Sequence, residues 1–183
     1  MIIAIIPAKG GSSRLPNKNM HPLLGKPMLK FAIDYAKQSK KISKIYVSTD
    51  DEKIAMFSGN HGVEVITRPV TLCGETPLID VYRHTLDIIG LRNVKTVVGI
   101  QADHPDRNIS LDNALSIYLD KHLDRLYSKG SNGTINGAVY IASANGIRKG
   151  HFEKEHFIID DCTNIHYFSD LLLAEERLRT RTS

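Results

Sequence analysis

The sequence contains no tryptophan, only two cysteines and no long apolar run. Cys73 and Cys162 cannot form the spaced framework of a metal-binding or disulfide-rich domain, so we expect two reduced thiols in a cytoplasmic protein. The longest apolar run, Met1–Ala8, is far shorter than the ~20 residues that a membrane-spanning helix needs. No positive segment precedes this run and no small-residue cleavage site follows it, as a signal peptide would require. We therefore expect no membrane partner.

The charge is unevenly distributed along the chain. The net charge is +4, from 24 basic and 20 acidic residues. The first 60 residues carry ten Lys or Arg against four Asp or Glu, a net charge of +6, whereas the remaining 123 carry 14 and 16. A local positive field suits a polyanionic ligand. Without tryptophan or a basic run interleaved with aromatic residues, nucleic acid is disfavoured, and we expect a small phosphorylated ligand instead.

Short apolar runs alternate with amphipathic stretches from the first residue onward. This alternation predicts an α/β fold: a three-layer α/β/α sandwich with a mostly parallel, Rossmann-like sheet. No repeat or long linker divides the chain, so we expect one domain over residues 1–183. The predicted strands are 2–6, 45–48, 63–66, 96–100 and 138–141. The predicted helices are 27–38, 51–59, 77–89, 112–122 and 169–178, with Pro27 and Pro77 in first turns, Thr49 or Asp50 as a cap, and a fraying tail at 179–183.

The loop after the first strand is the first candidate site, because ligands of such sheets bind beyond the carboxyl ends of the strands. It combines two adjacent glycines, two serines and three cations within residues 7–19. Backbone amides and cations gathered in one loop form a concave anion site of the kind that binds phosphates. The loop fits neither of the two common phosphate-binding patterns. The alternative is a solvated loop that happens to contain Lys and Arg.

Residues 6–19, with the sequence IPAKGGSSRLPNKN, resemble the signature loop of the cytidylyltransferases that make CMP-activated acid sugars. These are the CMP-sialic acid synthetases and their CMP-Kdo, legionaminic and pseudaminic relatives. The likeness continues in family order through LGKPM at 24–28, VSTDDEKIA at 47–55, Arg68-Pro69 with Thr76, NGAVYI at 136–141, and Asp170-Leu171 with Ala174-Glu175. It is the order of these pieces that makes the resemblance specific.

The resemblance implies transfer of CMP from CTP to the anomeric hydroxyl of an acid sugar, with Mg²⁺ as cofactor and release of pyrophosphate. Lys9, Arg14 and Lys18 would hold the triphosphate, and Lys18 would stabilise charge on the α-phosphate. Arg68 would lie near the cytosine or the phosphates. Positioning and charge neutralisation are physically sufficient for this chemistry. The implied nucleotide-binding set is Ala8, Lys9, Gly10, Gly11, Ser12, Arg14, Lys18, Arg68 and Gln101.

A second candidate group follows the strand at 96–100. Gln101-Ala102-Asp103-His104-Pro105 differs from the Gln-Pro-Thr-Ser-Pro string of sialic acid synthetases and is more similar to the Gln-Gly-Asp-Glu-Pro string of the Kdo enzymes. That pattern implies that Asp103 binds Mg²⁺ and that Gln101 contacts nucleotide or sugar. A carboxylate beside a cationic phosphate loop suits a magnesium-nucleotide site. The alternative is that Asp103 is an ordinary turn residue or helix cap.

The sequence departs from the family before the last predicted helix. Asn164-Ile165-His166-Tyr167 stands where the family usually has Asp-Ile-Asp-Thr, so both carboxylates are missing. Asn164 still offers an oxygen. His166 could bind a phosphate, act as a general base, hold a water on the metal, or be purely structural. Asp160 and Asp161 could supply charge, or form a solvated turn.

The middle of the chain is also short. Only residues 122–135 connect the helix at 112–122 to the NGAVYI strand, where the family usually has a sugar-binding and dimerising hairpin. A homodimer is therefore possible but with a reduced or different interface. We treat the remaining histidines as surface or packing residues, and single out His104 because it adjoins Asp103.

Three other functions stay open from the sequence. The same fold could act on another nucleotide or acceptor. The chain could also be a catalytically silent nucleotide-binding protein. A related glycosyltransferase would need an Asp-x-Asp motif, which the sequence lacks.

Overall fold

The computed structural model describes residues 1–90 and 93–181, which form a seven-stranded sheet in the order β5-β4-β1-β6-β8-β7-β9. The strands are β1 (Ile2–Pro7), β4 (Lys44–Thr49), β5 (Glu64–Thr67), β6 (Thr96–Gly99), β7 (Arg125–Lys129), β8 (Ile135–Ser143) and β9 (Glu155–Ile159). β1 pairs in parallel with β4 and β6, β4 with β5, and β7 with β9. β8 runs antiparallel to both of its neighbours. A two-stranded ribbon, β2 (Pro22–Leu23) with β3 (Lys26–Pro27), lies outside this sheet.

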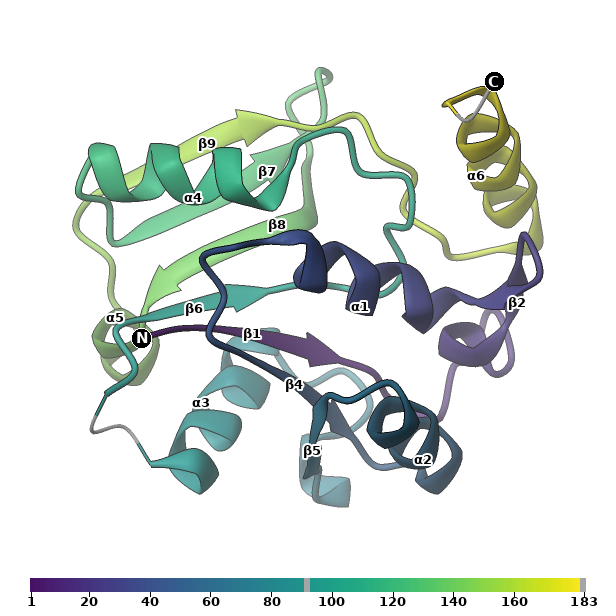
Figure 1. Cartoon of the computed structure of the whole chain (residues 1–183), viewed down its shortest axis with the longest axis horizontal. Coiled ribbons are helices and arrows are strands. Elements are labelled where there is room, and N and C mark those ends of the chain that lie inside the picture. The colour runs from purple at the N-terminus through teal and green to yellow at the C-terminus, as the bar shows by residue number, and fades with distance from the viewer. Residues whose placement is uncertain (91–92, 182–183) are drawn as a thin grey trace.

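Helices cover both faces of the sheet, so the predicted three-layer sandwich is confirmed (Figure 1). One face carries α1 (Met28–Gln38), α2 (Glu52–Asn60) and α4 (Leu111–Asp120), whereas the other carries α3 (Leu78–Ile89) and α5 (Ala144–Lys149). The alternation of side chains along β1 explains the two cores. Ala4 and Ile6 point into the first, and Ile3 and Ile5 into the second, all of them fully buried.

A third apolar cluster joins the two ends of the chain. Helix α6 (Phe168–Arg181) buries Leu171 and Ala174 against Leu15 and Leu23 of the segment that follows β1. In Figure 1, α6 stands beside β2 and away from the centre of the sheet. The C-terminal helix therefore supports the loop that the sequence singles out as the candidate phosphate site.

The sequence prediction missed the ribbon β2–β3, the two short 3₁₀ helices and three larger elements. Strands β7 and β9 lie in regions that we left without structure, and so does the short helix α5. β7 alternates buried Leu126 and Ser128 with half-buried polar residues, so it lacks the apolar run that marks the central strands. β8 is also longer than predicted, and the expected connection 122–135 contains all of β7 and the first residue of β8.

Several helix boundaries differ from the prediction. Pro27 and Pro77 precede their helices as N-cap residues and do not occupy the first turn. The cap of α2 is Asp51, whose carboxylate accepts a hydrogen bond from the Ile54 amide at 2.9 Å, and not Thr49 or Asp50. Helix α6 continues to Arg181 where a fraying tail was expected, and residues 182 and 183 of that tail lie outside the described residues.

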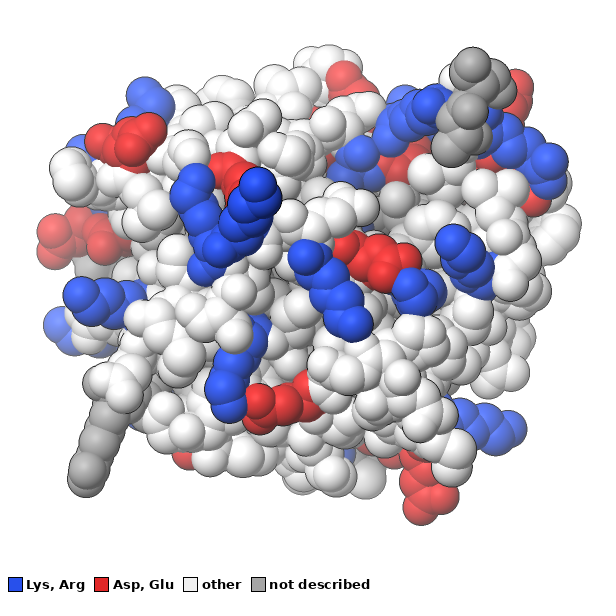
Figure 2. All heavy atoms as spheres, in the orientation of Figure 1, with Lys and Arg blue, Asp and Glu red and all other residues white. Residues whose placement is uncertain are grey.

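Across the described residues, none of the helices is long and apolar enough to cross a membrane. On the face that Figure 2 shows, acidic side chains lie among the basic ones, and basic side chains gather over α6. Arg177 and Arg179 of that helix are paired with Asp106 and Glu175. The charge of α6 is therefore partly neutralised by its surroundings.

Candidate nucleotide and metal site

A cleft of about 140 Å³ lies at the carboxyl ends of β1, β5 and β6, where ligands of open α/β sheets bind. Five residues predicted from the sequence line it: Lys9, Lys18, Arg68, Gln101 and Asp103. They come from three separate parts of the chain: the loop after β1, the end of β5 and the loop after β6. The fold therefore places three of the four predicted cations, all but Arg14, and the predicted metal carboxylate in one cleft.

The loop after β1 is fixed by contacts made within itself and with its neighbours. Asn17 adopts a left-handed conformation with φ 54°, which turns the chain into the short 3₁₀ helix Lys18–Met20. The Asn19 side chain donates to the Lys9 carbonyl at 2.8 Å, and the Lys9 ammonium donates to the Gly74 carbonyl at 3.0 Å. Asn19 was not singled out from the sequence, although it belongs to the quoted loop.

The remaining loop residues have different surroundings. Buried Ala8 extends the sheet, because its amide donates to the Ser48 carbonyl at 2.9 Å. The Gly10 amide donates to Asp50 at 3.0 Å, so it is already engaged and not free for a phosphate. A Cβ at Gly10 would lie 2.8 Å from that of Asp51, which explains the glycine. Gly11 has open space around it, Ser12 is half-buried and Arg14 is exposed.

Lys18 and Asp103 form the central contact of the cleft. The Lys18 ammonium lies 2.5 Å from Asp103 Oδ2, and both side chains are 15% exposed. The other carboxylate oxygen, Oδ1, lies 3.1 Å from Nδ1 of His104. Burial raises the pKa of Asp103, but His104 and Lys18 outweigh this effect and hold the pKa well below its usual range. Asp103 is therefore a carboxylate at neutral pH.

Arg68 and Gln101 are held at the walls of the cleft. The Arg68 guanidinium is buried and donates to the Ser48 carbonyl at 2.6 Å, and burial lowers its pKa. The Gln101 amide donates to the Gly137 carbonyl at 3.1 Å, so it is anchored to β8. A Cβ at Gly137 would lie 2.0 Å from Nε2 of Gln101, which explains the glycine at this position.

The segment that departs from the family, residues 164–166, packs directly against this centre. The Ile165 amide donates to the Asp103 carbonyl at 2.9 Å, and the Lys18 ammonium donates to the Ile165 carbonyl at 3.1 Å. Asp170 accepts hydrogen bonds from the amide of His166 and the next amide along the chain. Burial and the cations Lys18 and Arg14 lower the pKa of His166. His166 thus lies in the field of the same cations that would hold a phosphate.

The remaining candidates from this region, Asn164, Asp160 and Asp161, do not line the cleft around Asp103. Buried Asp160 accepts hydrogen bonds from the backbone amides of residues 108 and 109, which is a structural role. Asp161 accepts from the Ser131 amide at 2.6 Å. The Asn164 amide oxygen is buried without a hydrogen-bond partner in the described structure. Asp161 and Asn164 line a second cleft of about 380 Å³.

Arg107 is a residue that the sequence analysis did not find. Its guanidinium donates to the carbonyl oxygens of Gln101, His104 and Ala138, and lies 4.9 Å over the ring of Tyr35. These contacts fix the loop 101–107 against β8. An arginine two residues after a proline gives no local signal of such a role.

The donor chemistry of the cleft fits a magnesium ion that arrives with a nucleotide. Mg²⁺ is usually bound by one or two carboxylates together with phosphate oxygens and water. Asp103 supplies one ionised carboxylate beside Lys9 and Lys18. Among the described residues no group of three or more His, Cys, Asp and Glu could hold a metal ion. The residues therefore fit a metal shared with phosphates and not a metal held by protein alone.

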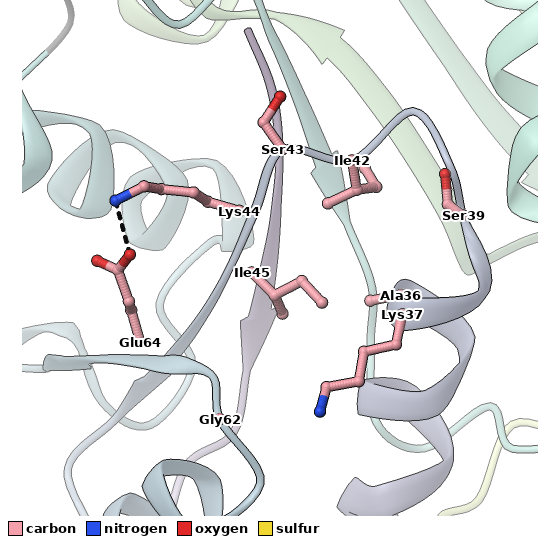
Figure 3. A pocket seen from close by; sticks show the side chains of 9 residues that line it. All are labelled: Ala36, Lys37, Ser39, Ile42, Ser43, Lys44, Ile45, Gly62 and Glu64. Atoms are coloured by element: carbon pink, nitrogen blue, oxygen red, sulfur yellow. Dashed lines mark hydrogen bonds and ion pairs between the residues drawn. The ribbon is translucent and has the colours of Figure 1, made fainter.

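A hollow of about 370 Å³ lies at the opposite end of the sheet, where β4 and β5 begin (Figure 3). Lys44 pairs with Glu64 across it at 2.7 Å, and Lys37 donates to the His61 carbonyl at 2.5 Å. Its position at the amino ends of the strands and its paired cations make it a poorer candidate for an anionic ligand than the cleft around Asp103.

Comparisons with known proteins bear on the family and the fold of the chain. A family profile described as cytidylyltransferase matches residues 3–145. An 8-amino-3,8-dideoxy-manno-octulosonate cytidylyltransferase from Shewanella sp. (strain W3-18-1) is 37% identical over 105 residues, which cover 57% of this chain and 41% of the relative. The match thus spans about two fifths of the length of that relative.

Solved structures share the fold at low identity. A CMP:2-keto-3-deoxy-manno-octonic acid synthetase complexed with CTP superimposes with a TM-score of 0.78 at 14% identity, covering 98% of this chain and 99% of that one. Rv0371c from Mycobacterium tuberculosis H37Rv, in complex with manganese, gives a TM-score of 0.69 at 12% identity. The match covers 96% of this chain and 98% of that one. The family profile, found on a chain of this fold, defines a protein of the nucleotidyltransferase class. Within that class, the chain belongs to the cytidylyltransferase family.

Proposed function

We propose that residues 1–183 act as one cytidylyltransferase domain that transfers CMP from CTP to the anomeric hydroxyl of an acid sugar. The observation that carries the proposal is the Lys18–Asp103 pair at 2.5 Å in a cleft that also contains Lys9 and Arg68. This combines an ionised carboxylate with cations at the ligand-binding edge of the sheet. Family membership supports the choice of CTP.

The residues of the chain have distinct roles in the proposed reaction. The acceptor oxygen forms a bond to the α-phosphorus, and the bond from that phosphorus to the bridging oxygen of the β-phosphate breaks. Lys9, Arg14 and Lys18 bind the triphosphate and neutralise the charge that develops on the leaving pyrophosphate. Gln101 and Arg68 hold the nucleotide at the wall of the cleft.

Asp103 would hold Mg²⁺, which supplies charge neutralisation on the phosphate oxygens when bound. The manganese-bound neighbour of the same fold supports a divalent cation. The acceptor proton leaves as the new bond forms. His166 is the group we assign to receive it, because its lowered pKa keeps the ring neutral, and only the neutral ring can accept a proton.

For the acceptor we propose an acid sugar similar to 8-amino-3,8-dideoxy-manno-octulosonate, which the name of the Shewanella relative gives. The cleft of about 380 Å³ next to residues 164–166 is lined by Asn136, Asn164, Asp161 and Arg177, whose guanidinium also contacts Asp106. Amide and guanidinium groups suit the hydroxyl and carboxylate groups of such a sugar. Asn136 directly precedes Gly137, which contacts Gln101, so this cleft adjoins the nucleotide site.

A second candidate function is a nucleotide-binding protein without activity. It is favoured by the segment Asn164–His166, which lacks the two carboxylates expected there. The deciding experiment is pyrophosphate release from CTP and Mg²⁺ over a panel of ulosonic and nonulosonic acids. We expect release with one acceptor, and at least about 100-fold less with Lys18→Ala or Asp103→Asn.

Lys40→Ala is the matched control, because Lys40 is exposed and lies outside the cleft. Its rate should equal that of the wild type. CTP binding without pyrophosphate release under any acceptor would favour the inactive alternative. Release that survives both cleft substitutions would refute the assigned site.

The proposal also includes a cytoplasmic location and a homodimer. Cys73 and Cys162 are both unpaired, which suits a reducing compartment. β9 is the last strand of the sheet and exposes Phe157 and Ile159, which offers an edge for a second copy. Light scattering of the purified chain tests the dimer, and a monomeric mass at micromolar concentration would exclude it.

A further inference from the structure

The two oxygens of Asp103 have different partners. Oδ2 faces Lys18, whereas Oδ1 lies 3.1 Å from Nδ1 of His104. A carboxylate only accepts hydrogen bonds, so Nδ1 of His104 carries the proton and donates it. The His104 ring is fully buried, with 0% of its side chain exposed. The buried His104 ring thus holds Oδ1 of the carboxylate, whereas Oδ2 faces Lys18 in the cleft.

The second ring nitrogen of His104, Nε2, indicates why a histidine is present at this position. Nε2 is buried and has no hydrogen-bond partner in the part of the chain that the structure describes. Burying an unpartnered polar atom is unfavourable, so an apolar side chain would pack better if packing were the only role. The bond from Nδ1 to Asp103 is therefore the contact that an imidazole provides here and an apolar residue would not.

The backbone around His104 is fixed as well. Its carbonyl oxygen accepts a hydrogen bond from the Arg107 guanidinium, which also holds the Gln101 carbonyl. The Asp103 carbonyl accepts from the Ile165 amide at 2.9 Å. Since the main chain on both sides is anchored, the Asp103 carboxylate is turned by its two side-chain partners, His104 at Oδ1 and Lys18 at Oδ2.

We propose that His104 is a positioning residue for the metal carboxylate: it holds Oδ1 of Asp103 and thereby presents Oδ2 to the divalent cation that accompanies CTP. The inference rests on the proposed function for the identity of that ligand. His104 does not touch nucleotide or metal itself. Partners that orient a metal ligand from outside the site typically change metal affinity by about 10–100-fold when they are removed.

The test compares His104→Asn with His104→Gln. The asparagine amide can occupy the position of Nδ1, whereas the glutamine amide lies one methylene farther and reaches toward Nε2. CTP affinity is measured by calorimetry, without acceptor, once with Mn²⁺ and once with EDTA. The ratio of the two affinities gives the contribution of the metal, and Asp103→Asn provides the reference for its loss.

We expect His104→Gln to lower this ratio about 10-fold or more and His104→Asn to change it less than about 3-fold. The affinity in EDTA should move little in either variant, because His104 acts only through the metal carboxylate. A general loss of structure would instead lower both affinities together. Thermal unfolding followed by circular dichroism verifies that each variant is folded. A folded His104→Gln with the wild-type ratio, or equal losses in both variants, would overturn the positioning role.

The result also separates this inference from the proposed function. A wild-type ratio near 1 would refute the metal requirement and the role of His104 with it. Absence of CTP binding under both conditions would refute the nucleotide site as a whole.

Discussion

Arg107 offers the most direct test of how the site is supported. Its three guanidinium nitrogens donate to the carbonyls of Gln101, His104 and Ala138. In Arg107→Lys a single ammonium replaces this planar group and reaches one of the three carbonyls. Hydrogen bonds to charged groups contribute about 1.5–3 kcal/mol each, so losing two lowers the free energy of unfolding by about 3–6 kcal/mol.

For a chain of this size, Tm changes by about 2–4 °C per kcal/mol, so we expect a fall of at least about 6 °C. Urea and thermal unfolding followed by circular dichroism measure both quantities. Arg125→Lys is the matched control: its pair with Glu155 is about one third exposed on each side, and such pairs contribute about 0–1 kcal/mol. If the two variants are equally stable, the inference that Arg107 anchors the loop is wrong.

Three further predictions concern the cleft. Gly137→Ala brings a Cβ within 2.0 Å of Gln101 Nε2 and should weaken CTP binding about tenfold, whereas Gly133→Ala, also at positive φ but in open space, should lower stability alone. The NMR titration midpoint of His166 should lie below the ordinary value of about 6.5 and rise in Lys18→Met, because the Lys18 charge lowers the pKa of this ring. Folding depresses the pKa of His166, so the neutral ring contributes its full stabilisation of the folded state above about pH 6.5. This stabilisation is lost as the pH falls through the pKa of the folded state. His166→Gln should reduce that loss. Leu171→Ala removes a buried contact between α6 and Leu15 and should cost about 2–5 kcal/mol, with faster amide exchange at Lys18–Met20. An unchanged exchange rate there would show that α6 does not support the loop.

The parts of the fold that the sequence predicted well are those with strong local patterns. β1 and β6 are mostly apolar because both faces of the central sheet are covered, and this composition is visible without a structure. β7 and β9 lie at the border of the sheet, where half-buried residues alternate and resemble a loop. The candidate cations could be found because they lie within one short segment.

The roles of the supporting residues could not be found in this way, although His104 itself was singled out as a neighbour of Asp103. His104 adjoins Asp103 in the sequence, but neither its complete burial nor its unpartnered nitrogen follows from that position. Arg107 contacts Ala138, which lies 31 residues away, only because β8 runs beside β6. Such contacts depend on tertiary packing, which the local pattern of a sequence does not determine.

The contact between Lys18 and residue Ile165 has a consequence for synthesis on the ribosome. The two residues are 147 positions apart, so at about 5–20 residues per second Lys18 is made roughly 7–30 seconds before Ile165. During this interval the nascent chain has the cationic loop without the segment that packs against it. A newly made chain therefore acquires its complete site only late in translation, after the central strands are already available to fold.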